Sequence, residues 1–149
     1  MKPKVRLAVP GLGETMVLQS LSGLPAFLIY FVVAAVLVAA YLYVYTWITA
    51  HDEFALLRAN NTAAAISLGL SMIGFVLPLT SSIGHADNVV DMAIWGVIAL
   101  IVQVAVYYAA RFAVPNLSAR IEAGEIAPAI WLGAASVSAG MLNAAAMGV

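Results

Sequence analysis

The chain has 149 residues, of which 64% are hydrophobic and 9% are charged, and its net charge is −1. A soluble domain carries about 25% charged and about 45–50% apolar residues, so this composition excludes a soluble globular protein and predicts a lipid environment. No basic stripe indicates a nucleic-acid partner. The chain has no cysteine, which excludes disulfides and thiolate chemistry.

The first 24 residues are predicted to be a tail that precedes the membrane-spanning part. They begin with a basic segment, but Pro10 and Gly11 interrupt the apolar residues that follow it. A signal peptide needs a longer unbroken apolar segment, so we expect an uncleaved tail. The stretch ETMVLQSLSG, residues 14–23, favours a short interfacial helix leading into the first span.

Apolar segments that can span a membrane as helices follow this tail, each near the roughly 20 residues that a span requires. They cover residues 25–49, 62–79, 91–114 and 125–147. Amphipathic aromatic rings prefer the headgroup region, so an interfacial belt is expected from Tyr41, Tyr43, Tyr45 and Trp47. The predicted fold class is an all-α integral membrane protein with four transmembrane helices.

The chain also matches itself without gaps when it is shifted by 64 positions, so that Tyr43 aligns with Tyr107 and Gly69 with Gly133. Each copy contains a long aromatic-ended helix, a polar loop and a helix of small residues. Residues 25–84 and 85–149 are therefore predicted to be two repeats. Because two spans return the chain to its starting side, both repeats have the same orientation, unlike the inverted repeats of many transporters.

Parallel repeats place the polar loops 51–61 and 115–124 on one side of the membrane. Lysine and arginine near span ends favour the cytoplasm, but the count is three on each side. The basic residues of the N-terminal tail lie roughly 20 residues before the first span, where the rule has less force. We therefore expect cytoplasmic repeat loops and both termini outside.

Small residues in the second and fourth spans predict that these helices meet at the centre of a four-helix bundle. Lipid provides no hydrophobic driving force between helices, so close contact depends on small side chains. The alternative interpretation is that these small residues face lipid and have no role in helix contact. Gln103 in the third span is expected to form hydrogen bonds to another helix rather than to contact a substrate. The residues assigned to helix packing are Gly69, Gly74, Pro78, Gln103, Gly133, Gly140 and Asn143.

The first repeat loop, HDEFALLRANN, concentrates polar residues but lacks the spacing of a metal or catalytic site. His51, Asp52 and Glu53 are consecutive and would point in different directions on a helix, whereas metal pairs need i, i+3 or i, i+4 spacing. No phosphate-binding loop or nucleophile motif is present. We therefore expect no catalytic residues, no metal, no cofactor and no enzymatic activity.

The same loop is expected to form a short interfacial helix over Asp52–Ala59. An exposed ion pair would join Arg58 to Glu53 or Asp52, and such pairs stabilise by only about 0.2–1 kcal/mol. A turn and a helix cap explain the asparagines that follow, but capping does not require Glu53. The candidate functional loop therefore consists of Glu53, Arg58, Asn60, Asn61 and Thr62.

The runs HDEFALLRANNTAAAISLG and GFVLPLTSS resemble the first-repeat signature of the YjfL-like bacterial inner-membrane proteins, and GAASVSAGMLNAAAMGV is similar to their C-terminal ending. The resemblance covers residues 30–149. It implies a four-span inner-membrane protein with cytoplasmic repeat loops and a duplicated domain of unknown function. Leu70 departs from the pattern where relatives carry glycine, so the contact face of the second span is expected to be shifted or looser. Matching positions are Glu53, Asn61, Thr62, Ala63, Gly74, Pro78 and Leu79.

Two functions remain open at this point. The resemblance implies a link to envelope stress and PspA-like membrane-remodelling proteins, and it favours a non-enzymatic membrane subunit that docks a cytoplasmic or peripheral membrane-stress protein. The alternative is an oligomeric pore or small-solute channel, lined by the small and hydroxyl-bearing faces of the second and fourth spans. Four helices are too few for a wide pore, so this alternative requires a homo-oligomer.

Overall fold

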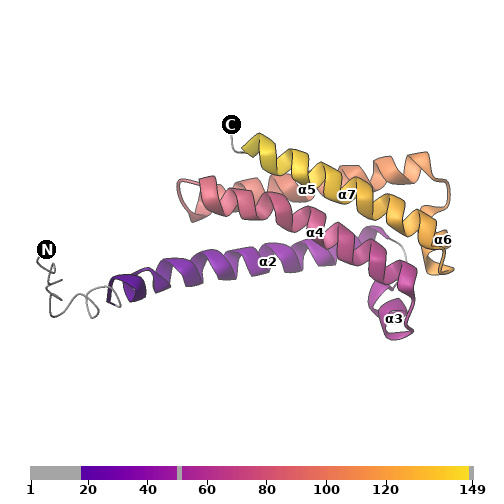
Figure 1. Ribbon diagram of the computed structural model, residues 1–149, viewed down its shortest axis with the longest axis horizontal. Helices are drawn as coiled ribbons and strands as arrows, with labels where there is room; N and C mark the ends of the chain where they lie inside the picture. The colour runs from indigo at the N-terminus through magenta and orange to yellow at the C-terminus, as the bar shows by residue number, and fades with distance from the viewer. Residues whose placement is uncertain (1–17, 50–51, 148–149) are drawn as a thin grey trace, which may run out of the picture.

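Figure 1 shows the computed structural model, which describes residues 18–49 and 52–147. Within these residues, the long helices are α2 (Leu24–Ile48), α4 (Thr62–His85), α5 (Val89–Ala113) and α7 (Ile126–Met147). Each of them is long and apolar enough to cross a membrane. The short helices α3 (Glu53–Arg58) and α6 (Leu117–Glu122) connect them in pairs. The prediction of an all-helical fold with four spans is therefore confirmed.

The segment before α2 was expected to contain an interfacial helix over residues 14–23. Residues 18–22 are helical and a turn at Gly23 separates them from α2. The earlier part of this segment lies outside the described residues. Helix α2 then begins at Leu24 with a proline in its first turn, where the missing N–H of proline leaves no helical hydrogen bond unmade.

Helix α4 differs most from its predicted span, because it continues beyond Pro78 to His85. A proline cannot donate a hydrogen bond to the carbonyl four residues earlier, which here belongs to Gly74. Neighbouring helices can compensate for such freed backbone groups in membranes. Here the Cα of Gly140 in α7 lies against the carbonyl oxygen of Gly74, so that a Cα–H···O contact replaces part of the lost interaction.

The local structure repeats with the same shift as the sequence. Helix α6 begins and ends 64 positions after α3, at 117 against 53 and at 122 against 58. Asn60 and Gly124 follow these helices at matching positions, and both have a positive φ. Such left-handed residues end helices in the Schellman turn. The corresponding backbone hydrogen bonds run from Asn61 N–H to Leu56 O and from Glu125 N–H to Arg120 O.

Helices α4 and α7 lie side by side and run in the same direction (Figure 1). Both short helices lie at one end of the bundle, which we term the loop-helix end, and the α4–α5 connection lies at the other. Helix α5 packs against both α4 and α7, whereas α2 packs against α4 and α5. The two α-hairpins thus have the same orientation along the bundle.

Glycines allow the close approach of α4 and α7. A methyl group on Gly74 would lie 2.5 Å from the carbonyl oxygen of Ser136, and one on Gly140 would overlap the carbonyl oxygen of Gly74. A methyl group on Gly133 would overlap the side chain of Leu70. The departure of Leu70 from the family pattern had suggested a looser contact face. The face is not looser, because the side chain of Leu70 fills the space beside Gly133.

Gly69 is the repeat counterpart of Gly133, but its surroundings are different. No atom lies within 4 Å of the position that a Cβ of Gly69 would occupy. Gly69 is therefore not required for the close approach of α4 and α7.

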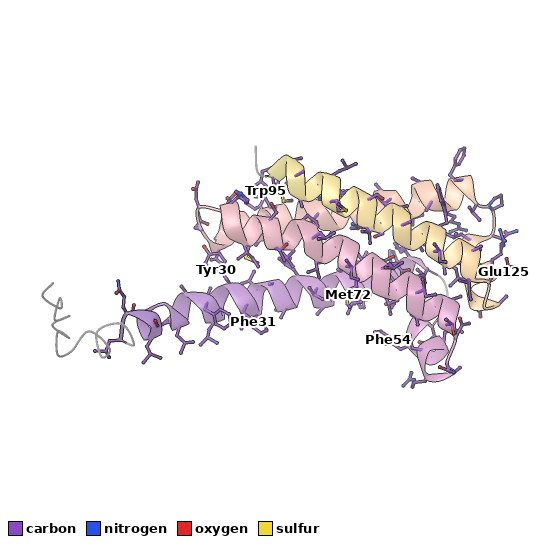
Figure 2. All side chains as sticks on the ribbon, viewed as in Figure 1. Tyr30, Phe31, Phe54, Met72, Trp95 and Glu125 are labelled. Atoms are coloured by element: carbon purple, nitrogen blue, oxygen red, sulfur yellow. The ribbon has the colours of Figure 1, made fainter. Side chains whose placement is uncertain are left out.

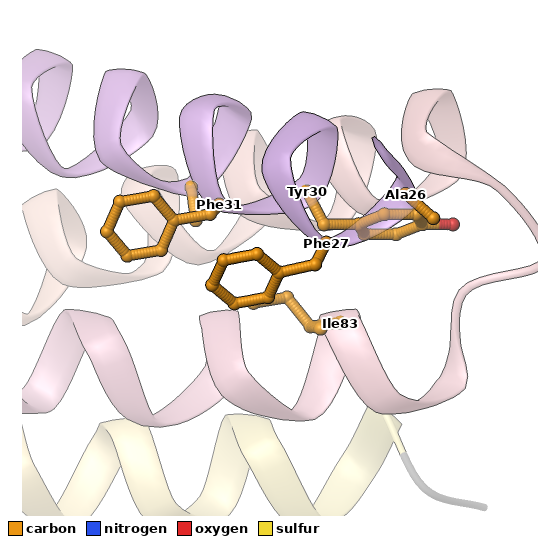
Figure 3. A pocket seen from close by; sticks show the side chains of 6 residues that line it. Ala26, Phe27, Tyr30, Phe31 and Ile83 are labelled. Carbon is orange, nitrogen blue, oxygen red and sulfur yellow. The ribbon is translucent and has the colours of Figure 1, made fainter. Parts of the chain in front are cut away.

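Helix α2 diverges from α4 towards its N-terminal end (Figure 1). Between the two helices lies an apolar groove of about 320 Å³, shown in Figure 3. Phe27 and Phe31 stack there with ring centroids 5.7 Å apart. The groove is lined by Ala26, Phe27, Tyr30, Phe31, Ala34 and Ile83.

Candidate functional site

Helix α3 forms where the sequence predicts it, with Asp52 and Ala59 as its caps. The Asp52 carboxylate accepts a hydrogen bond of 2.9 Å from the N–H of Ala55, which satisfies one of the free donors at the helix start. Glu53 in the first turn and Arg58 in the last turn both complement the helix dipole. His51, which precedes this helix, lies outside the described residues.

Glu53 is not on the surface, where the sequence had suggested an exposed ion pair with Arg58. Its side chain is 0% exposed, whereas Phe54 beside it is 48% exposed. In Figure 2, Phe54 lies at the loop-helix end of the bundle. Arg58 lies at the other end of α3 and is exposed, so the predicted exposed pair with Glu53 is wrong. The alternative partner of Arg58, Asp52, uses its carboxylate to cap α3. A carboxylate is almost never fully buried unless it is paired, so Glu53 is the unusual residue of this helix.

Asn61 connects the two repeats at the loop-helix end. Its side-chain oxygen accepts a hydrogen bond of 3.0 Å from the N–H of Ala64 and caps α4. Its side-chain nitrogen donates one of 2.9 Å to the carbonyl oxygen of Glu122, at the end of α6. Asn60 supplies the left-handed turn before it, and Thr62 is the exposed first residue of α4. One end of the Asn61 side chain therefore caps α4, and the other joins the start of α4 to the end of α6.

The aromatic residues at the end of α2 divide between two environments. Tyr43 and Trp47 are exposed, as an interfacial belt requires, but Tyr41 and Tyr45 are each only 3% exposed. The belt prediction is therefore wrong for the latter two. A spacing of four residues places them on one helix face, and Tyr41 stacks on Phe75 of α4 with centroids 4.5 Å apart.

The interior of the bundle contains what we term the buried polar cluster, which extends from α3 to the middle of the spans. Its central part joins α5, α7 and α4. Gln103 donates a hydrogen bond of 3.1 Å to the carbonyl oxygen of Ser136 and accepts one of 2.5 Å from the Ser136 hydroxyl. That hydroxyl also lies 3.4 Å from the carbonyl oxygen of Ser71. The cluster comprises Tyr41, Tyr45, Glu53, Ser67, Ser71, Gln103 and Ser136.

The part of the cluster nearest the loop-helix end is less well satisfied. The Tyr45 hydroxyl interacts electrostatically with Glu53 and lies close to the hydroxyls of Ser67 and Ser71. The hydroxyls of Tyr45 and Ser71 nevertheless form no hydrogen bond with the described residues. An unsatisfied buried polar group costs about 1–3 kcal/mol. Sequence reasoning missed Tyr45, although its spacing from Tyr41 matches that of Ser67 and Ser71.

Other polar groups are placed away from this cluster. The side-chain nitrogen of Asn143 is enclosed and forms no hydrogen bond within the described residues. At the loop-helix end, Arg120 and Glu125 form an exposed ion pair of 2.6 Å, and the hydrogen bond to Glu125 raises the pKa of Arg120. In the described part of the chain, no three His, Cys, Asp or Glu side chains gather as a metal site would require.

Comparison with known proteins places this architecture among bacterial membrane proteins. Residues 19–147 match the family described as Domain of Unknown Function (DUF350). The UPF0719 inner membrane protein YjfL of Escherichia coli (strain K12) is 36% identical over 127 residues, which cover 85% of this chain and 96% of that relative. The protein of the same name from Escherichia coli O157:H7 matches with the same values. No solved structure matches the chain.

Proposed function

The chain belongs to the DUF350 family, and we propose that it is a non-enzymatic inner-membrane subunit that docks a peripheral protein. The partner class is a cytoplasmic or membrane-associated protein of envelope maintenance. The observation that carries this proposal is the placement of α3 and α6 at the same end of the bundle, where Asn61, between α3 and α4, bonds to Glu122 of α6. Two short helices fixed in this way present a preformed surface, which limits the entropy lost on binding.

The exposed side chains of α3 give this surface its chemistry. Phe54 offers an aromatic side chain and Arg58 a guanidinium group, and both lie on the same short helix. Aromatic and arginine side chains dominate the binding energy of many interfaces. Glu53, which the sequence suggested as a contact residue, is buried beneath them and serves to support α3 rather than to touch a partner.

The pore alternative has less support. It was motivated by the small and hydroxyl-bearing faces of α4 and α7, but these faces pack against each other. Ser67, Ser71 and Ser136 are buried, and Gly74 contacts Gly140 directly. A pore would have to form between subunits and be lined by other faces. The oligomeric state in detergent tests this alternative. A monomeric protein would exclude a pore formed between subunits but would be compatible with docking.

Docking is tested with a photo-reactive amino acid placed at position 54 or 58 in cells. We expect both positions to cross-link to the same peripheral protein, and Arg58→Glu to reduce the product formed from position 54 at least about tenfold. The matched control is position 90, an exposed residue at the opposite end of the bundle. Products that form equally from position 90, or an Arg58→Glu variant with unchanged product, would contradict docking at α3.

The proposed orientation places the loop-helix end in the cytoplasm and both termini outside. A reporter fused after Val149 should therefore be active if it is alkaline phosphatase and inactive if it is green fluorescent protein. Fusions truncated after residue 58 should give the opposite pattern, because a single span precedes that point. Cytoplasmic signal at Val149 would reverse the orientation and would move the docking surface outside.

A further inference from the structure

The loop-helix part of the buried polar cluster collects oxygen atoms from three helices. Tyr45 comes from α2, Glu53 from α3, and Ser67 and Ser71 from α4. All four side chains are at most 3% exposed. The Tyr45 hydroxyl lies close to the hydroxyls of both serines and interacts electrostatically with Glu53. The Tyr45 hydroxyl therefore lies among the polar groups of the other three side chains.

Two of these oxygens need a further ligand. The hydroxyls of Tyr45 and Ser71 are enclosed and form no hydrogen bond with the described residues. The Ser67 hydroxyl donates its proton to the carbonyl oxygen of Ala64 at 3.2 Å, which leaves its lone pairs available. Buried polar groups without a protein partner commonly indicate a bound water or ion.

The chemistry of these groups indicates the kind of ligand. They offer hard oxygen atoms and one carboxylate, without nitrogen or sulfur. Transition metals favour imidazole or thiolate ligands, and calcium sites use several carboxylates. Within the described residues, no cluster of three His, Cys, Asp or Glu side chains exists. A single negative charge with neutral hydroxyls suits a monovalent cation.

We propose that Tyr45, Glu53, Ser67 and Ser71 bind one monovalent cation, for which sodium is the probe. Because Glu53 is the first residue of α3, the ion joins this helix to α2 and α4. The site is independent of the docking proposal, since it requires no partner protein. Either proposal can fail while the other holds.

The test compares the melting temperature of the purified full-length protein in sodium chloride and in choline chloride at equal ionic strength. A ligand that binds the folded state stabilises it in proportion to the logarithm of its concentration. We expect melting at least about 3 °C higher in sodium. Equal melting temperatures in the two salts would show a bound water only, and dependence on pH but not on sodium would show a proton site. Either result would overturn the proposal.

Variants assign the sodium effect to these residues. Ser71→Ala and Tyr45→Phe should abolish the difference between the two salts, and Glu53→Gln should reduce it. Ser71→Ala is the most informative, because its hydroxyl has no hydrogen-bond partner and its removal should not impair folding in choline. Glu125→Gln, an exposed carboxylate at the same end, is the control that should keep the difference. A sodium effect retained by Ser71→Ala or lost in Glu125→Gln would contradict the assignment.

Discussion

Gly140→Ala should destabilise the protein by roughly 3 kcal/mol, at or above the upper end of the usual range for overpacking. The added methyl group would overlap the carbonyl oxygen of Gly74, and this obstacle is backbone rather than a flexible side chain. Helices α4 and α7 would have to separate, which would also break the contact between the Ser136 hydroxyl and the carbonyl oxygen of Ser71. The measurement is the melting temperature of the purified variant in detergent.

Gly69→Ala provides the matched control in the same helix pair. Since no atom lies within 4 Å of the new methyl group, the variant should be as stable as the parent, or up to about 1 kcal/mol more stable through helix propensity. Gly133→Ala should fall between the two variants, because the obstacle is the side chain of Leu70. Similar destabilisation by Gly69→Ala and Gly140→Ala would contradict the observed packing.

Asn61→Ala should cost about 2 kcal/mol of stability. The loss of a helix cap typically costs about 1 kcal/mol, and the lost hydrogen bond to Glu122 adds about 0.5–1.5 kcal/mol. The substitution should also loosen the end of α6 from the start of α4, so hydrogen exchange of the amides in α6 should accelerate. Chemical or thermal unfolding in detergent measures the first effect, and exchange followed by mass spectrometry measures the second.

Asn61→Ser separates the two roles of this side chain. Serine caps helices about as well as asparagine, but it lacks the amide nitrogen that reaches Glu122. We therefore expect about half of the stability loss but the full acceleration of exchange in α6. If Asn61→Ser behaved like the parent in both measurements, the bond between the repeats would contribute nothing.

The number and order of the spans could be predicted from the sequence, because length and hydropathy decide them. The repeat was also predictable, since the shift of 64 recurs in the positions of α3 and α6. The extension of α4 beyond Pro78 could not be predicted from the sequence. It depends on a neighbouring helix that approaches the freed carbonyl, and a single helix in sequence gives no sign of that neighbour.

The burial of the two tyrosines and of Glu53 in the polar cluster escaped prediction, whereas the bonding of Gln103 across helices was expected. A belt of aromatic residues and a buried pair look alike in sequence, and only packing against Phe75 separates Tyr41 from Tyr43. Glu53 was recognised as unexplained by capping, but its burial could not be foreseen because the adjacent Phe54 is the more apolar residue. Burial here follows from the position of α3 on the bundle rather than from local hydrophobicity.

The parallel packing of α4 and α7 underlies both the enclosed cluster and the placement of the two short helices at one end of the bundle. Because the chain has no cysteine, an introduced pair reports on this packing without interference. The Ser81 hydroxyl donates a hydrogen bond of 2.9 Å to the carbonyl oxygen of Ala144. Oxidation of a variant with cysteine at positions 81 and 144 should therefore give a cross-link within one chain, and a variant with cysteine at positions 81 and 127 should give none. A cross-link only in the second variant would mean that α7 runs antiparallel to α4, which would contradict the parallel repeats.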